Sequence, residues 1–202
     1  MEIKMKKRVL VLASALLLPI GSHQAAESIR CDTASFSCQS LDVDRDKLTG
    51  FGVSGTKLIS EDFFIVGSYS FVSDDVDVFR SKVDIDFNTQ YLGLSYLQAM
   101  SDNTNLFGII SYQDVDIDAS FQENSEDKSE NGYGLQVGMR SLVTENIELR
   151  SSLSFAEIAD ASETGFDFSA MYHFTEQFSA GAGYGKSDDI DSLSLSAVLF
   201  FN

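Results

Sequence analysis

The stretch that decides the fold runs from Tyr133 to Phe155 and reads YGLQVGMRSLVTENIELRSSLSF. In its first half apolar residues occupy every second position, with Gly, Gln or Arg between them. The second half alternates in the same way after the short turn Thr144–Asn146. A period of two is typical of β-strands with one apolar face, so this stretch predicts an antiparallel hairpin.

The same unit recurs along the chain from Leu48 onward. Each unit is a run of about ten alternating residues followed by a turn, and Ile109-Ile110 breaks the alternation in a way that predicts a bulge. Nine runs follow this pattern: 48–59, 63–73, 87–99, 105–118, 132–143, 147–158, 165–174, 178–187 and 190–201.

The connections between these runs alternate in length. Ser60–Asp62, Ser101–Thr104, Thr144–Asn146 and Thr175–Gln177 read as tight turns. Longer acidic connections lie around Asp74–Asp86, Asp118–Asn131 and Asp160–Thr164, with a shorter one at Ser187–Asp189. Short turns alternating with long loops are typical of bacterial outer-membrane barrels, which keep the short turns in the periplasm.

The alternation of short periplasmic turns with long outer loops fixes the direction of each strand and predicts a further strand before Leu48. If both ends of the barrel lie in the periplasm the strand number is even, so we expect a tenth, weakly alternating strand within Ser28–Val43. That segment could instead be a plug or a periplasmic segment, and eight strands is the alternative count. The predicted fold is an all-β, antiparallel, up-and-down transmembrane β-barrel of about ten strands.

The amino terminus predicts export. Lys4, Lys6, Lys7 and Arg8 precede a ten-residue apolar run, Val9–Leu18, and small residues that end at Ala26. This is the pattern of a Sec-type signal peptide, and ten helical residues are too short to span a bilayer. We expect residues 1–26 to be removed and residues 27–202 to form a single barrel domain in the outer membrane.

Charge and composition exclude one class of partner. The chain of 202 residues has a formal net charge of −17, and removal of residues 1–26 leaves 10 Lys and Arg against 30 Asp and Glu. Such a chain repels phosphate backbones, so nucleic-acid binding is not expected. Pro19 is the only proline, which suits a mature chain that is nearly all paired strand.

Two cysteines enter an oxidising compartment after export. Cys31 and Cys38 are therefore expected to form a disulfide. Their odd spacing would place them on opposite faces of a strand, so the bridge requires residues 32–37 to bend.

Several motifs resemble one family. The signal peptide, the alternating runs, Gly50–Gly55 followed by Glu61–Phe64, and the final strand Leu195–Phe201 resemble the small outer-membrane protein β-barrel family, which includes the OmpA-type transmembrane domain and OmpX-like barrels. The resemblance implies that the assembly machinery of the outer membrane recognises a C-terminal aromatic residue. Here that residue would be Phe201, although Asn202 follows it.

Charged residues on the polar face form the main candidate site. With the turn centred on Glu145, Arg140 faces Arg150 and Glu148 lies diagonally from Arg140. We predict an ion-pair network that fills the lumen, with a gate or selectivity ring as the alternative. The small residues Ser179, Gly181, Gly183 and Gly185 share one face, and they predict close packing or bending of that wall, or a small cavity beside it.

Catalysis and dedicated metal binding are not expected. His173 is the only histidine after cleavage, and Asp167 and Ser169 lie too far along the same strand to form a relay with it. The acidic clusters lack the Gly and Glu of an EF-hand loop, and alternate carboxylates on a strand form a charged rim instead of a cage. They are Asp42-x-Asp44-x-Asp46, Asp75-x-Asp77, Asp84-x-Asp86, Asp114-x-Asp116-x-Asp118 and Asp188-Asp189-x-Asp191.

The leading functional prediction is a non-enzymatic outer-membrane barrel with an acidic extracellular surface and no cofactor, in an envelope-structural or surface-interaction role. The expected partners are outer-membrane lipid and lipopolysaccharide, with divalent cations as bridges. A narrow pore and a barrel enzyme are the alternatives. A secreted lipocalin-type barrel would need an apolar interior, the reverse of the pattern around Arg140 and Arg150.

Overall fold

The computed structural model describes residues 32–43, 46–78, 81–121, 124–159, 161–188 and 190–201. The expected signal peptide and Cys31 lie outside these residues. Among the described residues, no helix is long and apolar enough to cross a membrane.

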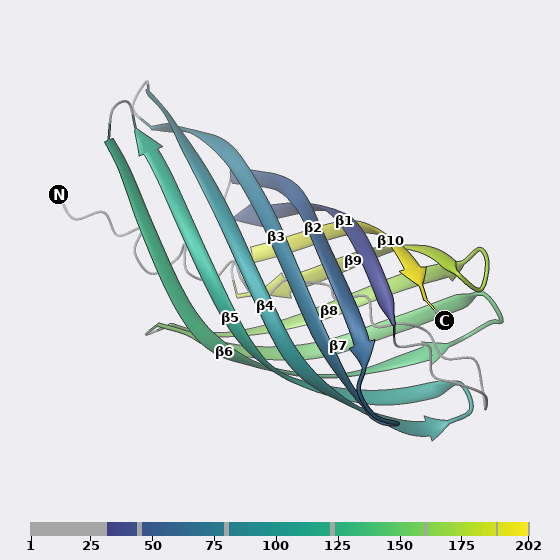
Figure 1. Ribbon diagram of the computed structural model, residues 1–202. Coiled ribbons are helices and arrows are strands. Elements are labelled where there is room, and N and C mark those ends of the chain that lie inside the picture. Colours follow the sequence, from purple (N-terminus) through teal and green to yellow (C-terminus); the bar gives the residue numbers. More distant parts are fainter. Residues whose placement is uncertain are drawn as a thin grey trace.

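Ten strands close into one antiparallel barrel (Figure 1). Each strand pairs with its neighbours in sequence, and β1 closes the barrel by pairing with both β2 and β10. The tenth strand predicted within Ser28–Val43 is therefore confirmed as β1. The strands are β1 Thr33–Val43, β2 Asp46–Leu58, β3 Phe63–Val78, β4 Ser81–Ser101, β5 Thr104–Phe121, β6 Asn124–Leu142, β7 Ile147–Ile158, β8 Ala161–His173, β9 Phe178–Ser187 and β10 Ile190–Phe200.

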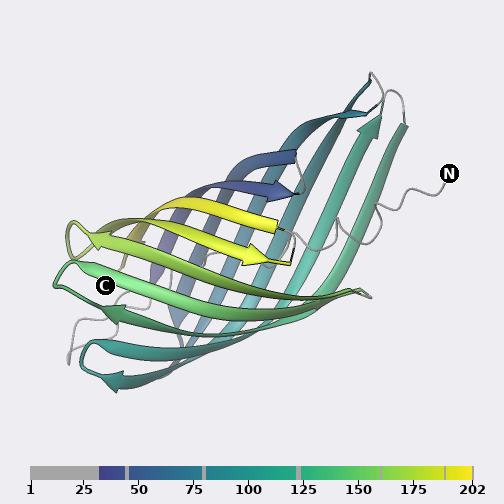
Figure 2. The same cartoon turned by 180° about the vertical axis from the view of Figure 1, so that it is seen from behind.

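The barrel has one tall wall and one low wall. Strands β3–β6 have 16 to 21 residues, whereas β1, β9 and β10 have 10 or 11. Figures 1 and 2 show β3–β6 rising well beyond the other strands at the end opposite the C-terminus. By the convention that short turns and both termini face the periplasm, this tall wall projects outside the cell.

The prediction of long acidic loops is wrong for the β3–β4 and β5–β6 connections. The β3–β4 pairing continues to Val78 opposite Ser81, and the β5–β6 pairing continues to Phe121 opposite Asn124. The Asp-x-Asp clusters there alternate with Val and Ile, and this period of two favours a paired strand over a loop. The acidic segments thus extend the sheet itself.

The prediction of a bulge at Ile109-Ile110 is also wrong. The β4–β5 register runs continuously past these residues and shifts only between Ala99 and Ser101. Ile109 points inward and is 1% exposed, whereas Ile110 points outward and is 61% exposed. Two apolar residues in a row fit an unbroken strand because the lumen of this barrel is itself partly apolar.

Two groups of outward aromatic residues mark the membrane band. Near the periplasmic turns, Phe63 packs on Tyr96 and Phe174 packs on Tyr172. Nearer the outer end, Tyr112 packs on Tyr133. Aromatic girdles of this kind flank the apolar band of outer-membrane barrels, which is about 25 Å tall.

Candidate functional site: the lumen

Polar and small residues line much of the lumen, whereas large apolar residues cover the outside. On β7, for example, Arg150 and Ser152 are buried inside, and Leu153 is 61% exposed outside. This is the alternation of a membrane barrel, and it is the reverse of a lipocalin-type interior.

A cluster of apolar side chains lies in the lumen toward its outer end. Its eight buried members touch one another and come from seven of the ten strands, and we call them the outer apolar ring. On the β8–β9 side the ring is completed by the Ser187 hydroxyl, which donates to a Glu163 carboxylate oxygen at 2.5 Å. The ring consists of Leu41, Leu48, Val72, Phe87, Val115, Ile117, Ile158 and Ile190.

A second apolar cluster lies on the inner face of β3–β5 at the periplasmic end. It contains Phe64, Val66, Leu97, Phe107 and Ile109, and none of these is more than 4% exposed. The alternating pattern alone predicts a polar lumen. The apolar residues of both clusters instead fill the interior by close packing, as expected of a small barrel.

The predicted charged residues lie together on the inner face of β6 and β7. Arg140 pairs directly across from Arg150, and Glu148 lies one pleat away, opposite Leu142. Their exposed fractions are 2% for Arg140, 8% for Arg150 and 5% for Glu148. These side chains, together with Asp167, form what we call the charged layer.

Asp167 on β8 is the member of the charged layer that the sequence did not single out as a partner of the arginines. It is 5% exposed and lies one pleat from the position opposite Arg150, since Arg150 pairs with Ser169 and Ser152 pairs with Asp167. A short polar chain orients it, because Gln136 Nε2 donates to Ser152 Oγ at 2.9 Å and Ser152 Oγ donates to Asp167 Oδ2 at 3.4 Å. Two carboxylates thus face two guanidinium groups.

A glycine allows an aromatic ring to reach Arg150. Gly138 on β6 lies between Phe107 on β5 and Ser152 on β7, and a Cβ at Gly138 would stand 2.4 Å from Phe107 Cζ. The ring therefore extends across β6 and places its centroid 4.4 Å from Arg150 Cζ. This cation–π contact stabilises a guanidinium whose Nε and Nη2 atoms have no hydrogen-bond partner among the described residues.

The small residues on the inner face of β9 have a similar role beside the charged layer. Gly185 pairs with Asp167, and a Cβ at Gly185 would stand 2.7 Å from Asp167 Oδ1 and 2.6 Å from Ser192 Oγ. The space beside this wall is thus occupied by a carboxylate. In the sequence, this contact was signalled by a glycine at an inward-facing position that pairs with a larger residue on the neighbouring strand.

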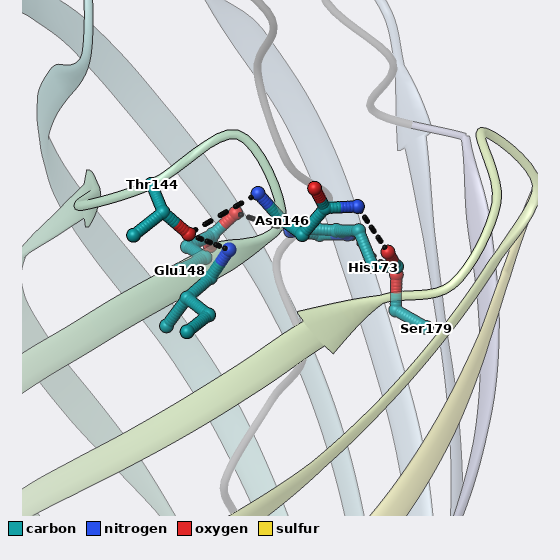
Figure 3. A network of polar contacts seen from close by, with 6 residues as sticks. Thr144, Asn146, Glu148, His173 and Ser179 are labelled. Carbon is teal, nitrogen blue, oxygen red and sulfur yellow. Dashed lines mark hydrogen bonds and ion pairs between the residues drawn. The ribbon is translucent and has the colours of Figure 1, made fainter.

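His173 connects the charged layer to the periplasmic end of the lumen (Figure 3). Its Nδ1 atom lies 2.5 Å from Ser179 Oγ, and its Nε2 atom lies 3.5 Å from Glu148 Oε2. Asn146 in the β6–β7 turn fixes the backbone here, since its side-chain nitrogen donates to the His173 carbonyl at 2.9 Å. His173 therefore contacts Ser179 and Glu148, not Asp167 and Ser169.

The serine, histidine and glutamate are arranged like a catalytic triad but are closed to substrate. Ser179 is 0% exposed, whereas a nucleophilic hydroxyl must come within bonding reach of a substrate carbonyl. The histidine ring also packs near Phe200, with ring centroids 6.1 Å apart. This geometry favours a packed structural network.

The bridge expected between Cys31 and Cys38 conflicts with strand β1. Cys31 lies outside the described residues, but the six residue-to-residue steps of the extended chain from Asp32 to Cys38 span about 20 Å. One further residue shortens this by at most ~4 Å, and a disulfide requires Cα atoms within about 7 Å. The required bend is absent because residues 33–37 pair in register with both β2 and β10. Cys38 is a free thiol on the exposed outer face.

The acidic residues of the tall wall lie on its outer face. Asp114, Asp116 and Asp118 alternate with the buried Val115 and Ile117 and are half-buried. Across the β4–β5 pairing, Asp118 lies opposite Asp86. In the described part of the chain, no group of three or more His, Cys, Asp or Glu residues is arranged to hold a metal ion.

The C-terminal residues alternate like the rest of β10. Phe200 points inward and is 4% exposed, and Phe201 is 52% exposed. The Phe201 N–H donates to the Asp32 carbonyl at 2.9 Å, which joins the two ends of the described chain.

Solved structures share this architecture at low sequence identity. The KdgM porin in complex with disordered oligogalacturonate is 9% identical, with 84% of this chain and 99% of that chain covered and a TM-score of 0.51. An outer membrane channel from Pseudomonas putida F1 is 10% identical, with 90% and 99% covered and a TM-score of 0.50. Ail, the attachment invasion locus protein of Yersinia pestis, is 11% identical, with 84% and 95% covered and a TM-score of 0.45.

The porin and the Pseudomonas putida channel, with TM-scores of 0.51 and 0.50, support the fold alone. No curated protein matches the sequence. The sequence profile of the outer membrane protein beta-barrel domain matches residues 10–174, which is most of the chain. The protein therefore belongs to the outer membrane protein beta-barrel domain family.

Proposed function

We propose that this protein is a closed, non-enzymatic barrel whose function lies at the outer surface, in an envelope-structural or surface-interaction role. The observation that supports this proposal best is the outer apolar ring. Side chains from seven strands meet across the lumen, and each member is at most 8% exposed. Such an apolar layer opposes the passage of a hydrated solute, and the polar groups at this level, Ser187 and Glu163, are hydrogen-bonded to each other.

Conductance in planar bilayers tests the closed barrel. We expect the wild-type protein to stay at background and the double variant Phe87→Ser, Ile117→Ser to show discrete openings. Both residues belong to the ring and face each other across the β4–β5 pairing. The matched control Leu92→Ser, Ile110→Ser changes outward residues of the same two strands and should not conduct. Wild-type conductance well above background would establish the narrow pore instead.

The tall wall is the surface that would act outside the cell. Residues 124–130 of β6 pair with β5 only, because the pairing with β7 begins at Gly132 and the Asn131 carbonyl accepts from the Ala159 N–H just after β7. The outer face of this wall carries Asp86, Asp114, Asp116 and Asp118. Lipopolysaccharide phosphates are also anionic, so close approach favours bridging by Mg²⁺ or Ca²⁺.

Thermal unfolding in lipopolysaccharide-containing bilayers tests this partnership. At equal ionic strength we expect a higher midpoint in Mg²⁺ than in NaCl, since screening alone is the same in both. The variant Asp114→Asn, Asp116→Asn should lose that difference. The control Asp62→Asn, Asp102→Asn, in two periplasmic turns, should retain it. Equal wild-type midpoints would leave the acidic face as a solvated, repulsive surface.

The proposed route to the membrane uses both ends of the chain. Residues 1–26 would direct export as a Sec-type signal peptide, and Phe201 would present the aromatic signal to the assembly machinery. Deleting residues 201–202 should lower the yield of folded barrel in outer membranes, measured by the gel mobility shift on boiling. An unchanged yield would show that the signal lies elsewhere.

A further inference from the structure

A hollow of about 750 Å³ lies on the outside of the barrel across β5–β8. The hollow lies on the outer side of the same part of the barrel wall whose inner face carries the charged layer, because Gly138, Ser152 and Asp167 also line it. Its large walls are outward side chains that are 40% to 61% exposed: Leu106, Val137, Met139, Leu153, Phe166 and Phe168.

Small outward residues create this hollow. Ser151 lies among the large walls, because it pairs with Met139 on one side and with Phe168 on the other. Gly108, which pairs with Val137, points outward, and a Cβ placed there would meet nothing within 4 Å. Ser151 and Gly108 therefore lower the outer surface between the larger side chains that surround them.

The height of the hollow determines what can enter it. Ser151 is four residues beyond the start of β7, which places it about 10 Å above the periplasmic turn for a strand tilted by 35–45°. This level is inside the apolar band and in its periplasmic half. Hydrocarbon surrounds the barrel here, so water and soluble ligands do not reach the hollow.

We infer that the hollow holds one acyl chain of a phospholipid from the periplasmic leaflet. Its volume is within the roughly 300–1,000 Å³ of ordinary small-molecule sites. Six large apolar side chains surround this shallow hollow, so a chain lying in it makes more dispersion contacts than a chain on a flat or convex surface. The ligand is recognised by its hydrocarbon, and the headgroup remains at the periplasmic interface.

Native mass spectrometry tests the inference with dipalmitoyl phosphatidylethanolamine added to the delipidated, folded barrel in detergent. We expect one lipid per wild-type chain and at least a tenfold loss of the bound form in Ser151→Phe, which fills the hollow. Ala182→Phe, at an outward position on β9, is the control and should bind as the wild type does. Equal retention in both variants, or none in the wild type, overturns the inference.

A second copy of this chain would give a different result. A doubled wild-type mass that returns to the single-chain mass in Ser151→Phe would also overturn the inference, because the hollow would then be a protein contact.

A second measurement does not depend on filling the hollow. The chain has no tryptophan, so Leu153→Trp and Leu195→Trp each provide a single reporter, the first at the hollow and the second on the far strand β10. The fluorescence of each variant is measured in phospholipid vesicles with a rising fraction of brominated chains. The relative affinity for brominated lipid obtained from the quenching curve should be several-fold higher for Leu153→Trp than for Leu195→Trp. Identical quenching curves would refute a specific acyl-chain site.

Discussion

Replacing Glu148 with Ala should destabilise the barrel by removing one of the two carboxylates of the charged layer. Glu148 is 5% exposed, lies one pleat from Arg140 and contacts His173 at 3.5 Å. Breaking a buried ion pair by removing one partner costs roughly 3–5 kcal/mol, because the remaining charge is left without compensation. Asp167 still faces Arg150 in this variant, so we expect the lower end, about 3 kcal/mol.

Urea unfolding in phospholipid vesicles provides the assay, followed by far-UV circular dichroism and by gel mobility. With a slope of about 2 kcal/mol per M, the expected loss lowers the midpoint by roughly 1.5 M. Glu157→Ala is the matched control, since it makes the same change on the same strand at an exposed position. Its midpoint should stay within about 0.5 kcal/mol of the wild type.

The double variant Arg140→Ala, Glu148→Ala tests whether the two residues belong to one network. Removing one charge of each sign restores neutrality around Arg150 and Asp167. The double change should therefore cost at least about 1 kcal/mol less than the sum of the single changes. Additive costs, or a Glu148→Ala midpoint equal to that of Glu157→Ala, would refute the ion-pair reasoning.

Three further variants test other parts of the structure. Gly138→Ala should cost about 1–3 kcal/mol of unfolding free energy, because its Cβ would displace the Phe107 ring from Arg150, whereas Gly108→Ala should be nearly neutral. Hydrogen bonds from the side chain of Lys57 and from the Leu58 N–H hold the pKa of Asp32 below its usual 3.8. Asp32 therefore stabilises the folded state above about pH 4, and this contribution is lost as the pH falls through the lowered pKa. Asp32→Asn should then lie below the wild-type unfolding midpoint at neutral pH and approach it in acid. Cys38 should react with a membrane-permeant maleimide and not with a charged one, and reaction with both would show that its face meets water.

The sequence determined the class of fold because its signal is local. The alternation in Tyr133–Phe155 repeats along the chain, and a period of two specifies which face of each strand is apolar without any knowledge of its partners. The same parity placed Arg140, Glu148 and Arg150 on one face, since cross-strand pairs follow from the position of the turn. Even the weak strand β1 followed from a counting argument, because a closed barrel with both termini at one end needs an even number of strands.

Tertiary structure alone decided how far the strands extend and what fills the lumen. The segments 74–86 and 118–131 read as loops by composition, yet in their described residues pairing across β3–β4 and β5–β6 satisfies the backbone groups as strand. The bend that a Cys31–Cys38 bridge would require is absent for the same reason, since pairing with β2 and β10 keeps residues 33–37 extended. Contacts such as Phe107 with Arg150 across Gly138, or His173 with Ser179, join side chains on different strands. Such contacts depend on the volume left between strands, and that volume is a property of the closed barrel, not of any single stretch of sequence.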